Sequence, residues 1–381
     1  MNSHEAARPV LHTLNAVRVL AEYCIVSYHV FFGHPASVPA NYDSSELLSS
    51  HGVSVDLMSL FTVLSGFVAM YSNADLCDRA SRGRFLWRRF SRTYPVYAFS
   101  LALGLPHFCV AFLSRQPACI NDVVGLVSQF LCLQCWLGCG FVGSNPPSWY
   151  ISSMAWVWLL FPFLPLSRAL PRRPWLWVVL FYALSVASNM PFAGHDTANT
   201  RQLPAIRVWE FLMGCAAAHT LDEAHRVRGL LVASALAVYA VYACLSTAYA
   251  AEWDTPHAQD NCTFWESPPD PLLVRPGSFV TPTSIVWALL FHWLATHELA
   301  QRDHAVLRVL GFDFFRSLSA YSLQLYLCHL PISDAIQALF KLCGAHMWLS
   351  KDLLVVGCYC LSYSVYVYVQ PWLDRLTQPK A

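Results

Sequence analysis

The chain has 381 residues, of which 56% are hydrophobic and only 12% are charged, and its net charge is +1. A soluble domain usually carries about 25% charged residues, so this composition excludes an ordinary soluble protein, and the near-zero charge does not suggest a nucleic-acid partner. The recurring apolar stretches are long enough for membrane helices and too long for barrel strands. The sequence therefore predicts an all-α, polytopic transmembrane helical bundle, forming one domain over residues 1–381.

Ten apolar stretches along the chain are predicted to be membrane-spanning helices. Nearly all of them are long enough to cross a hydrocarbon core of about 30 Å. An eleventh apolar stretch, 123–141, is interrupted by Gln129, Gln134 and three glycines. The ten predicted spans are 15–33, 54–72, 93–114, 151–168, 174–190, 205–220, 228–248, 281–298, 318–340 and 352–372.

The basic residues predict which side of the membrane each loop faces, because cytoplasmic loops are enriched in Lys and Arg. Loop 34–53 contains neither residue and is predicted to lie outside. The basic residues of the later loops fall on the cytoplasmic side only if 123–141 is a re-entrant or interfacial segment on the outer side. That interpretation gives ten spans with both termini inside, and a full crossing of 123–141, giving eleven, is the alternative. The arginines predicted to lie inside are Arg79, Arg82, Arg84, Arg88, Arg89, Arg92, Arg168, Arg172, Arg173, Arg226, Arg228, Arg302 and Arg308.

The long polar loop 249–279 is external in the ten-span topology. It contains Asn261-Cys262-Thr263, which matches the N-glycosylation acceptor pattern. No cleavable signal peptide is evident in residues 1–16, and we expect a multi-pass protein of the plasma membrane or a secretory-pathway membrane. Several cysteines would share the oxidising side, where a disulfide can form: Cys119, Cys132, Cys135, Cys139 and Cys262.

Three ionisable residues lie on one face of the first span. On an α-helix Arg18, Glu22 and His29 fall within about 40° of one another, and the spacing of Arg18 and Glu22 lets them pair. Ionisable groups within a span usually face the bundle interior or a hydrated cavity. His29, about 16 Å beyond Arg18, is suited to general-base chemistry because histidine exchanges its proton near neutral pH. The alternative is a neutralising Arg18–Glu22 pair and a histidine that only bonds a neighbouring helix.

Six short motifs follow one another between residues 15 and 332. The first is Arg18, ten residues and His29 in "LNAVRVLAEYCIVSYHVF". The others are "SLFTVLSGFVAM" (59–70), "RFLWRRFSRTYPVY" (84–97), "PPSWYISSMAWVWLLFP" (146–162), "RVWEFLMG" (207–214) and "SLQLYLCHLPI" (322–332). In this order they resemble the motifs of the acyltransferase 3 family of integral membrane acyltransferases.

The resemblance implies a membrane enzyme of about ten helices that moves an acyl group, commonly acetyl from acetyl-CoA, to a hydroxyl of a carbohydrate or lipid-linked acceptor. Acyl-CoA and the acceptor would be its partners, and we expect no metal and no permanently bound cofactor. Two positions depart from the family pattern, because Met154 stands in place of a glutamate and Leu323 in place of a tyrosine. If that glutamate orients the histidine or the acceptor, Glu22 or Glu210 must substitute for it.

Acyl transfer to an alcohol needs a base for the hydroxyl proton, and His29 is the predicted general base. Glu22 and Ser65 are the other catalytic candidates. Ser65 would donate a hydrogen bond, although a small residue at this place also lets helices approach closely. Neither a GxSxG elbow nor a Ser-His-Asp order is evident, which favours direct transfer over a covalent serine intermediate.

Three arginines at the inner membrane boundary are candidates for binding the donor. Arg89 and Arg92 are three residues apart, and guanidinium groups bind phosphate bidentately; coenzyme A carries three phosphates. Arg18 would take another phosphate or pair with Glu22. The alternative for Arg89 and Arg92 is that they only follow the enrichment of basic residues inside.

Four residues are predicted to bind the acceptor: Trp149, Arg207, Glu210 and His329. Trp149 would stack on a sugar or sit at the membrane boundary, Arg207 and Glu210 would otherwise pair with each other, and His329 would otherwise bridge two helices. Two other functions stay open. A proton-coupled transporter also uses intramembrane Arg, Glu and His, although no inverted repeat is evident, and Met154 suggests a catalytically weak relative that binds acyl donors.

Overall fold

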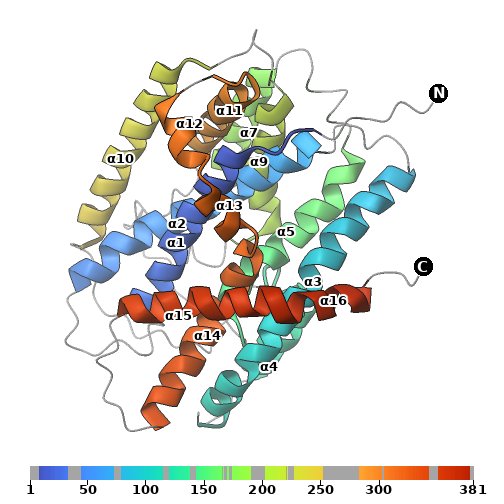
Figure 1. Ribbon diagram of the computed structural model, residues 1–381, viewed down its shortest axis with the longest axis vertical. Helices are drawn as coiled ribbons and strands as arrows, with labels where there is room; N and C mark the ends of the chain where they lie inside the picture. Colours follow the sequence, from blue (N-terminus) through green and yellow to red (C-terminus); the bar gives the residue numbers. More distant parts are fainter. Residues whose placement is uncertain are drawn as a thin grey trace.

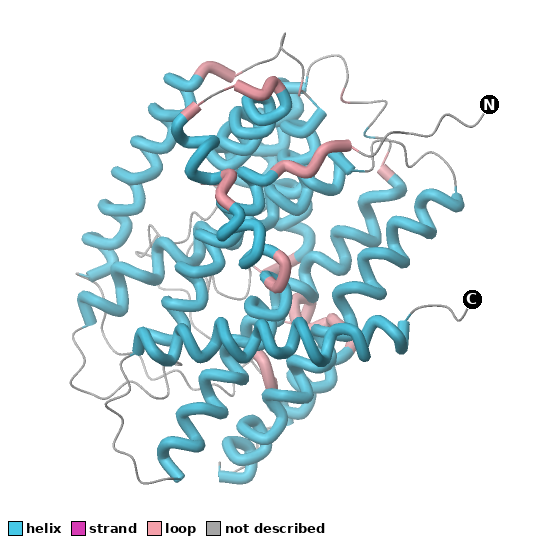
Figure 2. Tube along the Cα trace, viewed as in Figure 1, coloured by secondary structure: helices cyan, strands magenta, loops and turns pink. Residues whose placement is uncertain are grey.

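The computed structural model of the chain is built from helices, and the part that the structure describes contains no strand (Figures 1 and 2). The all-α prediction is confirmed for these residues. Helices that lie far apart in the sequence pack side by side into one bundle, with α14 against α3 and α9 against α2. The described residues are 8–32, 44–72, 79–114, 120–137, 143–164, 166, 170, 174–189, 202–219, 221, 227–251, 283–302, 304–342 and 351–377.

Each of the ten predicted spans overlaps a helix or a run of consecutive helices. The helices α2 and α3 begin earlier than predicted, at Ser44 and Arg79, so part of loop 34–53 and the arginines from Arg79 to Arg92 lie in helices rather than loops. The helices α12 (Ala305–Leu310) and α13 (Asp313–Ser319) connect α11 to α14. The helices at the predicted spans are α1 (His12–Phe32), α2 (Ser44–Ser72), α3 (Arg79–Ser114), α5 (Trp149–Leu160) with η3 (Phe161–Phe163), α7 (Pro174–Asn189), α9 (Pro204–His219), α10 (Gly229–Ala251), α11 (Ser284–Leu299), α14 (Ser322–Leu342), and α15 (Lys351–Ser364) with η7 (Val365–Val369) and α16 (Gln370–Thr377).

Several of these helices are shorter than the spans that hydropathy predicted. The span 151–168 is realised as α5, which ends at Leu160, because Pro162 in the following turn has no backbone N–H to continue the helix. Within the described residues, Asp352–Thr377 is the one helix both long and apolar enough to cross a membrane, and Leu57–Ser72, Pro174–Asn189 and Gly229–Val241 are apolar but shorter. The number of crossings stays a prediction.

The segment predicted to be re-entrant forms only a short helix. α4 (Ile120–Phe130) has 11 residues, or about 16 Å, roughly half the hydrocarbon thickness. The chain then turns at Cys132, whose φ is 55°. Irregular backbone at membrane depth is tolerated only where the protein itself pairs it, and here Tyr97 donates a hydrogen bond to the carbonyl of Gln129 at 2.6 Å.

Hydrogen bonds with the side chain of Gln129 also hold the residues that lead into η2 (Pro146–Ser148). The side chain of Gln129 accepts a hydrogen bond from the amide of Ser144 at 2.9 Å and donates one to the carbonyl of Asn145 at 3.2 Å. Gly104 of α3 allows this close packing, because a Cβ there would collide with the carbonyl oxygen of Ser144. The described part of this segment thus packs against α3 through buried polar contacts, and its re-entrant placement stays a prediction.

Helices α2 and α9 pack along each other at very close range. A Cβ on Gly66 would collide with the carbonyl of Phe211, and one on Gly214 would collide with the carbonyl of Val63. Small residues let membrane helices approach in this way. The glycines in "LSGF" and "RVWEFLMG" therefore have a packing role, which fixes α9 and its charged residues against α2.

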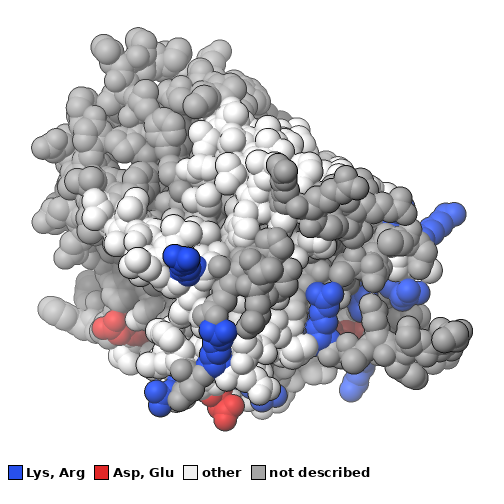
Figure 3. Space-filling model, turned by 90° about the horizontal axis from the view of Figure 1, so that it is seen from above, with Lys and Arg blue, Asp and Glu red and all other residues white. Residues whose placement is uncertain are grey.

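Four of the arginines predicted to lie inside, Arg168, Arg172, Arg173 and Arg226, lie outside the described residues, and several of the others are on helices that reach one end of the molecule. In Figure 1, α1, α3 and α10 begin toward the upper end, and α2 ends there. Seen from above, this end carries basic side chains along its edges and few acidic ones (Figure 3). The orientation of the chain in the membrane stays a prediction.

Some sequence predictions fall outside the described residues, namely the acceptor sequence Asn261-Cys262-Thr263 and the cysteines Cys119, Cys139 and Cys262. Of the cysteines predicted to share the oxidising side, the structure describes Cys132 and Cys135, and both are free thiols.

Candidate active site

The polar face of α1 points into the bundle. Its three ionisable residues all face the segment formed by α13 and α14: Arg18 donates a hydrogen bond from Nη2 to the carbonyl of Ser319 at 2.8 Å. Glu22 is 2% exposed and interacts with Ser322, and His29 contacts His329. The apolar residues on the rest of α1 make the helix stable in lipid, while this face forms one wall of the candidate site.

His29 and His329 form a hydrogen-bonded pair. Nδ1 of His29 lies 2.8 Å from Nε2 of His329, and the two ring planes are 13° apart. Nδ1 of His329 lies 2.7 Å from the carbonyl of Tyr326, and a carbonyl only accepts, so this nitrogen carries the hydrogen. In neutral His329 the acceptor is then Nε2, and His29 must donate from Nδ1. The lone pair of His29 therefore lies on Nε2.

His329, the buried member of the pair, is held in place by contacts between α14 and the loop that follows α4. Tyr326 donates a hydrogen bond to the carbonyl of Pro147 at 2.6 Å. Asn145 is fully buried, and its Nδ2 donates to the carbonyl of Leu327 at 2.8 Å and to Ser100 Oγ at 3.0 Å. These contacts fix the turn of α14 that precedes His329. The polar loop after α4 thereby positions the histidine pair.

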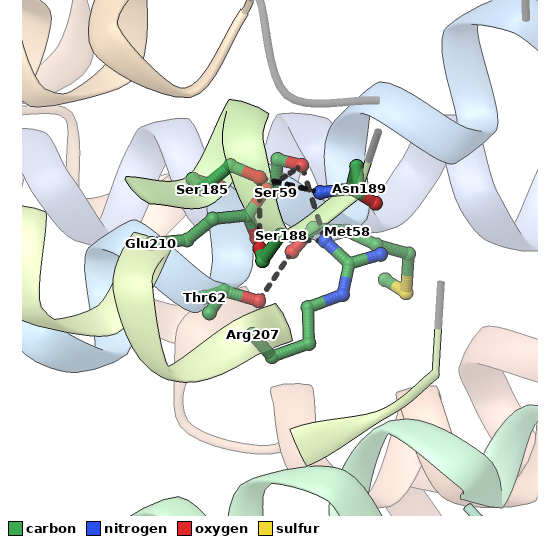
Figure 4. Close-up of polar contacts among 8 residues, drawn as sticks. All are labelled: Met58, Ser59, Thr62, Ser185, Ser188, Asn189, Arg207 and Glu210. Atoms are coloured by element: carbon green, nitrogen blue, oxygen red, sulfur yellow. Dashed lines mark hydrogen bonds and ion pairs between the residues drawn. The ribbon is translucent and has the colours of Figure 1, made fainter. Parts of the chain in front are cut away.

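Arg207, Glu210 and Ser59 form a second buried polar cluster (Figure 4). Arg207 Nη1 lies 2.7 Å from Glu210 Oε2, and both side chains are at most 2% exposed. Ser59 Oγ donates to Glu210 Oε1 at 2.7 Å and lies 3.1 Å from Arg207 Nη1. Every charged group is thus paired and hydrogen-bonded, which offsets much of the cost of burial. The internal ion pair is the alternative that the structure favours for these two residues.

Aromatic rings connect the ion pair to the histidine pair. The guanidinium of Arg207 lies 5.6 Å from the ring centroid of Trp149, which is buried. Trp149 contacts Tyr150, and Tyr150 contacts Tyr326 with ring centroids 5.8 Å apart. Tyr326 lies 6.2 Å from His329 by the same measure. Residues from α5, α9 and α14 therefore share one site.

The three arginines predicted to bind the donor lie near one another. The charge of Arg92 acts on both Arg18 and Arg89. Arg89 lies 5.7 Å from the ring of Trp158, and Trp158 Nε1 donates to Ser65 Oγ at 3.2 Å. Ser65 is thus placed with the arginines, not with His29. None of these three arginines forms an ion pair within the described residues, although the charge of the Glu22 carboxylate also acts on Arg18.

Two contacts that the sequence left open as alternatives are absent. No ion pair joins Arg18 to Glu22, and no hydrogen bond joins Glu22 to His29, within the described part of the chain. His329, rather than a carboxylate, orients His29. Met154, at the position of the expected glutamate, is a fully buried core residue.

Three residues of the site were missed by the sequence analysis. Tyr326 was detectable, because it lies three residues before His329 and so on the same helix face. Asn145 and Tyr150 sit next to recognised motif residues, but their contacts depend on where the loop folds back. No group of three or more His, Cys, Asp or Glu that could hold a metal ion occurs among the described residues.

The helices bring together a histidine pair in which His329 is buried, a cationic group and an aromatic lining. In agreement with this arrangement, the model of the family described as "Acyltransferase domain" matches residues 11–367. The chain belongs to this family, and it is a membrane acyltransferase. No curated protein and no solved structure matches the chain.

Proposed function

We propose that the chain is an integral membrane O-acyltransferase that moves an acyl group, acetyl in the simplest case, from acyl-CoA to a hydroxyl of a carbohydrate or lipid-linked acceptor. The proposal draws on the family for the type of reaction and on the histidine pair for the mechanism. The single observation that carries it is the contact of 2.8 Å between His29 Nδ1 and His329 Nε2, because it leaves the lone pair of His29 on the other nitrogen.

In the proposed reaction, Nε2 of His29 takes the proton of the acceptor hydroxyl as its oxygen attacks the thioester carbonyl. The new C–O bond forms, the C–S bond breaks, and the proton passes to the leaving thiolate to give free coenzyme A. His329 accepts the Nδ1–H of His29 throughout, and so holds the imidazole in the tautomer that can act as a base. It is a positioning residue in this scheme, rather than the acceptor-binding residue that we first predicted.

The donor is proposed to bind at the basic group of Arg18, Arg89 and Arg92. Three guanidinium groups near one another, none of them in an ion pair within the described residues, suit an anion with several phosphates. Arg18 lies eleven residues before His29 on α1, or about 16.5 Å along the helix axis. This length suits a donor whose phosphates stay at the inner boundary while its thioester reaches the histidine. Ser65, which binds the indole of Trp158 beneath Arg89, would support this group.

The acceptor is proposed to bind on the side of Trp149 and Tyr150. Aromatic rings pack against the apolar faces of sugars, and the tyrosine and tryptophan here also offer polar edges. Arg207 and Glu210 satisfy each other, so their part would be to hold Trp149 in place.

The test is acetyl transfer by the full chain, purified in detergent, from radiolabelled acetyl-CoA to a panel of glycans and lipid-linked sugars. We expect label in an acceptor, and a loss of about 10²- to 10⁴-fold in His29→Ala. His304→Ser is the matched control, because His304 is exposed and caps α12, a role that serine also fills. Donor binding without turnover would instead support a weak relative, for which the buried Met154 is the specific observation. Proton-coupled flux in liposomes without transfer would support a transporter.

A further inference from the structure

Two buried polar atoms on consecutive turns of α1 have no hydrogen-bond partner. They are Nε of Arg18 and Oε1 of Glu22. Glu22 is 2% exposed, and a buried polar atom left unpaired is costly. The two residues are about 6 Å apart along the axis, and their opposite charges act on each other, yet no ion pair joins them. The rest of each side chain is engaged with the facing segment, Arg18 with the carbonyl of Ser319 and Glu22 with Ser322.

The hydrogen-bonding character of the two atoms defines which kind of ligand could bind both of them. Nε of Arg18 is a donor, and Oε1 of a carboxylate is an acceptor. A ligand that lies between them must therefore present one acceptor and one donor a short distance apart. A secondary amide does so with its C=O and N–H, whereas an acyl chain or a phosphate does not.

The position of these atoms coincides with the path of the proposed donor. Glu22 precedes His29 by seven residues, or about 10.5 Å along α1. In an extended pantetheine arm, the outer amide nitrogen is seven bonds from the thioester sulfur, or about 9 Å for bonds of about 1.5 Å in zigzag. With the thioester beside His29 and the phosphates near Arg92, this amide falls at the level of Glu22.

We propose that Arg18 Nε and Glu22 Oε1 bind the outer amide of the pantetheine arm of acyl-CoA, an inference that rests on the proposed function. Glu22 accepts the amide N–H, Arg18 donates to the amide C=O, and the arm is held straight between the basic group and the histidine pair. Glu22 is then a donor-binding residue, and the catalytic role that its place on the polar face predicted falls to the histidine pair.

The test compares two variants that differ in the acceptor atom. Glu22→Met has a similar length but no oxygen, and Glu22→Gln keeps Oε1. Each is assayed with acetyl-CoA, with S-acetylpantetheine, which lacks the nucleotide phosphates but keeps both amides, and with S-acetyl-N-acetylcysteamine, which lacks the outer amide. We expect Glu22→Met to raise KM about 10- to 100-fold for the first two donors, with kcat and the third donor unchanged, and Glu22→Gln to retain most of the affinity.

An equal loss with all three donors, or no loss in Glu22→Met, would overturn the inference, since it would mean a structural residue or a site filled by water. The failure of the proposed function looks different. If the wild-type chain transfers no acetyl group, equilibrium dialysis with acetyl-CoA and S-acetylpantetheine decides the amide site by itself. Binding that weakens in Glu22→Met and persists in Glu22→Gln upholds it, and the absence of binding to the wild-type chain overturns it.

Discussion

His29 and His329 are 300 residues apart in the sequence, and their imidazoles meet with Nδ1 and Nε2 2.8 Å apart. The contact joins α1 to α14 and connects the first motif of the chain to the last. Of the two rings, His329 is completely buried and bonded to the backbone of its own helix. Its orientation is therefore fixed by the fold, and it imposes a single donor and acceptor arrangement on His29.

Replacing His329 is expected to lower the rate according to whether the new side chain can accept a hydrogen bond. In His329→Gln, the amide oxygen can reach the place of Nε2 and receive the Nδ1–H of His29, whereas His329→Leu has no acceptor. We expect kcat to fall about 10- to 100-fold in the leucine variant, as for other residues that orient a functional histidine, and much less in the glutamine variant. The measurement is acetyl transfer over a range of pH. Equal losses in both variants, with an unchanged pH profile, would mean that His329 serves only packing.

The buried pair of Arg207 and Glu210 is expected to respond to single and double substitution in opposite ways. Glu210→Met or Arg207→Met alone leaves one charge buried without its partner, which costs about 3–5 kcal/mol. The double variant removes both charges and is expected to regain most of that stability. Thermal unfolding in detergent measures the difference, and Arg84→Gln at an exposed site is the control. A double variant as unstable as the sum of the single ones would show that the two side chains act independently.

The positions of the helices could be predicted because hydropathy acts locally, along each segment. All ten predicted spans overlap helices, whereas the interrupted segment 123–141 contains only the short helix α4 in its described part. The lengths were less predictable, as at α5, where Pro162 ends the helix although the sequence stays apolar. Hydropathy reports how apolar a residue is, but it does not report that proline lacks the backbone N–H that a helix needs.

The contacts within the candidate site were harder to predict than its members. His29, His329, Arg207 and Glu210 were all recognised, but a spacing of four along α1 suggested that Arg18 pairs with Glu22, and the facing backbone of Ser319 competes for that arginine. Side chains on one helix face can meet each other or a neighbouring helix, and only tertiary packing decides between them. Asn145 and Tyr326 entered the site for the same reason, since both are positioned by contacts across the fold.

Arg92 is expected to affect binding of the phosphates of the donor and nothing else. It is exposed, its charge acts on Arg18 and Arg89, and its removal leaves no buried gap. We expect Arg92→Gln to raise KM for acetyl-CoA about 3- to 10-fold, because one charge-assisted hydrogen bond is lost, with KM for S-acetylpantetheine unchanged. Arg84→Gln tests whether any nearby positive charge suffices, as Arg84 is an exposed arginine on the same helix. Similar increases in KM for acetyl-CoA in both variants would point to general electrostatic attraction of the donor by the basic surface.

The close approach of α2 and α9 is expected to make Gly66 intolerant of any side chain. In Gly66→Ala the new methyl group collides with the carbonyl of Phe211, and in Gly214→Ala it collides with that of Val63. Backbone atoms on a packed helix yield only if the helices separate, so we expect a loss of about 3 kcal/mol or more, typical of a strongly overpacked core, and a matching loss of folded protein. Gly83→Ala is the matched control, because nothing lies within 4 Å of its added Cβ.

At Gly83 the same substitution should stabilise α3 slightly, by about 0.5–1 kcal/mol, since alanine loses less conformational freedom in a helix than glycine. Monodispersity in detergent and the unfolding midpoint measure the three variants side by side. If Gly66→Ala unfolds at the same temperature as Gly83→Ala, the two helices must lie farther apart than the structure has them. Ser59, on α2, would then no longer be held against Arg207 and Glu210 of α9, and the second polar cluster would have to be abandoned together with the close packing.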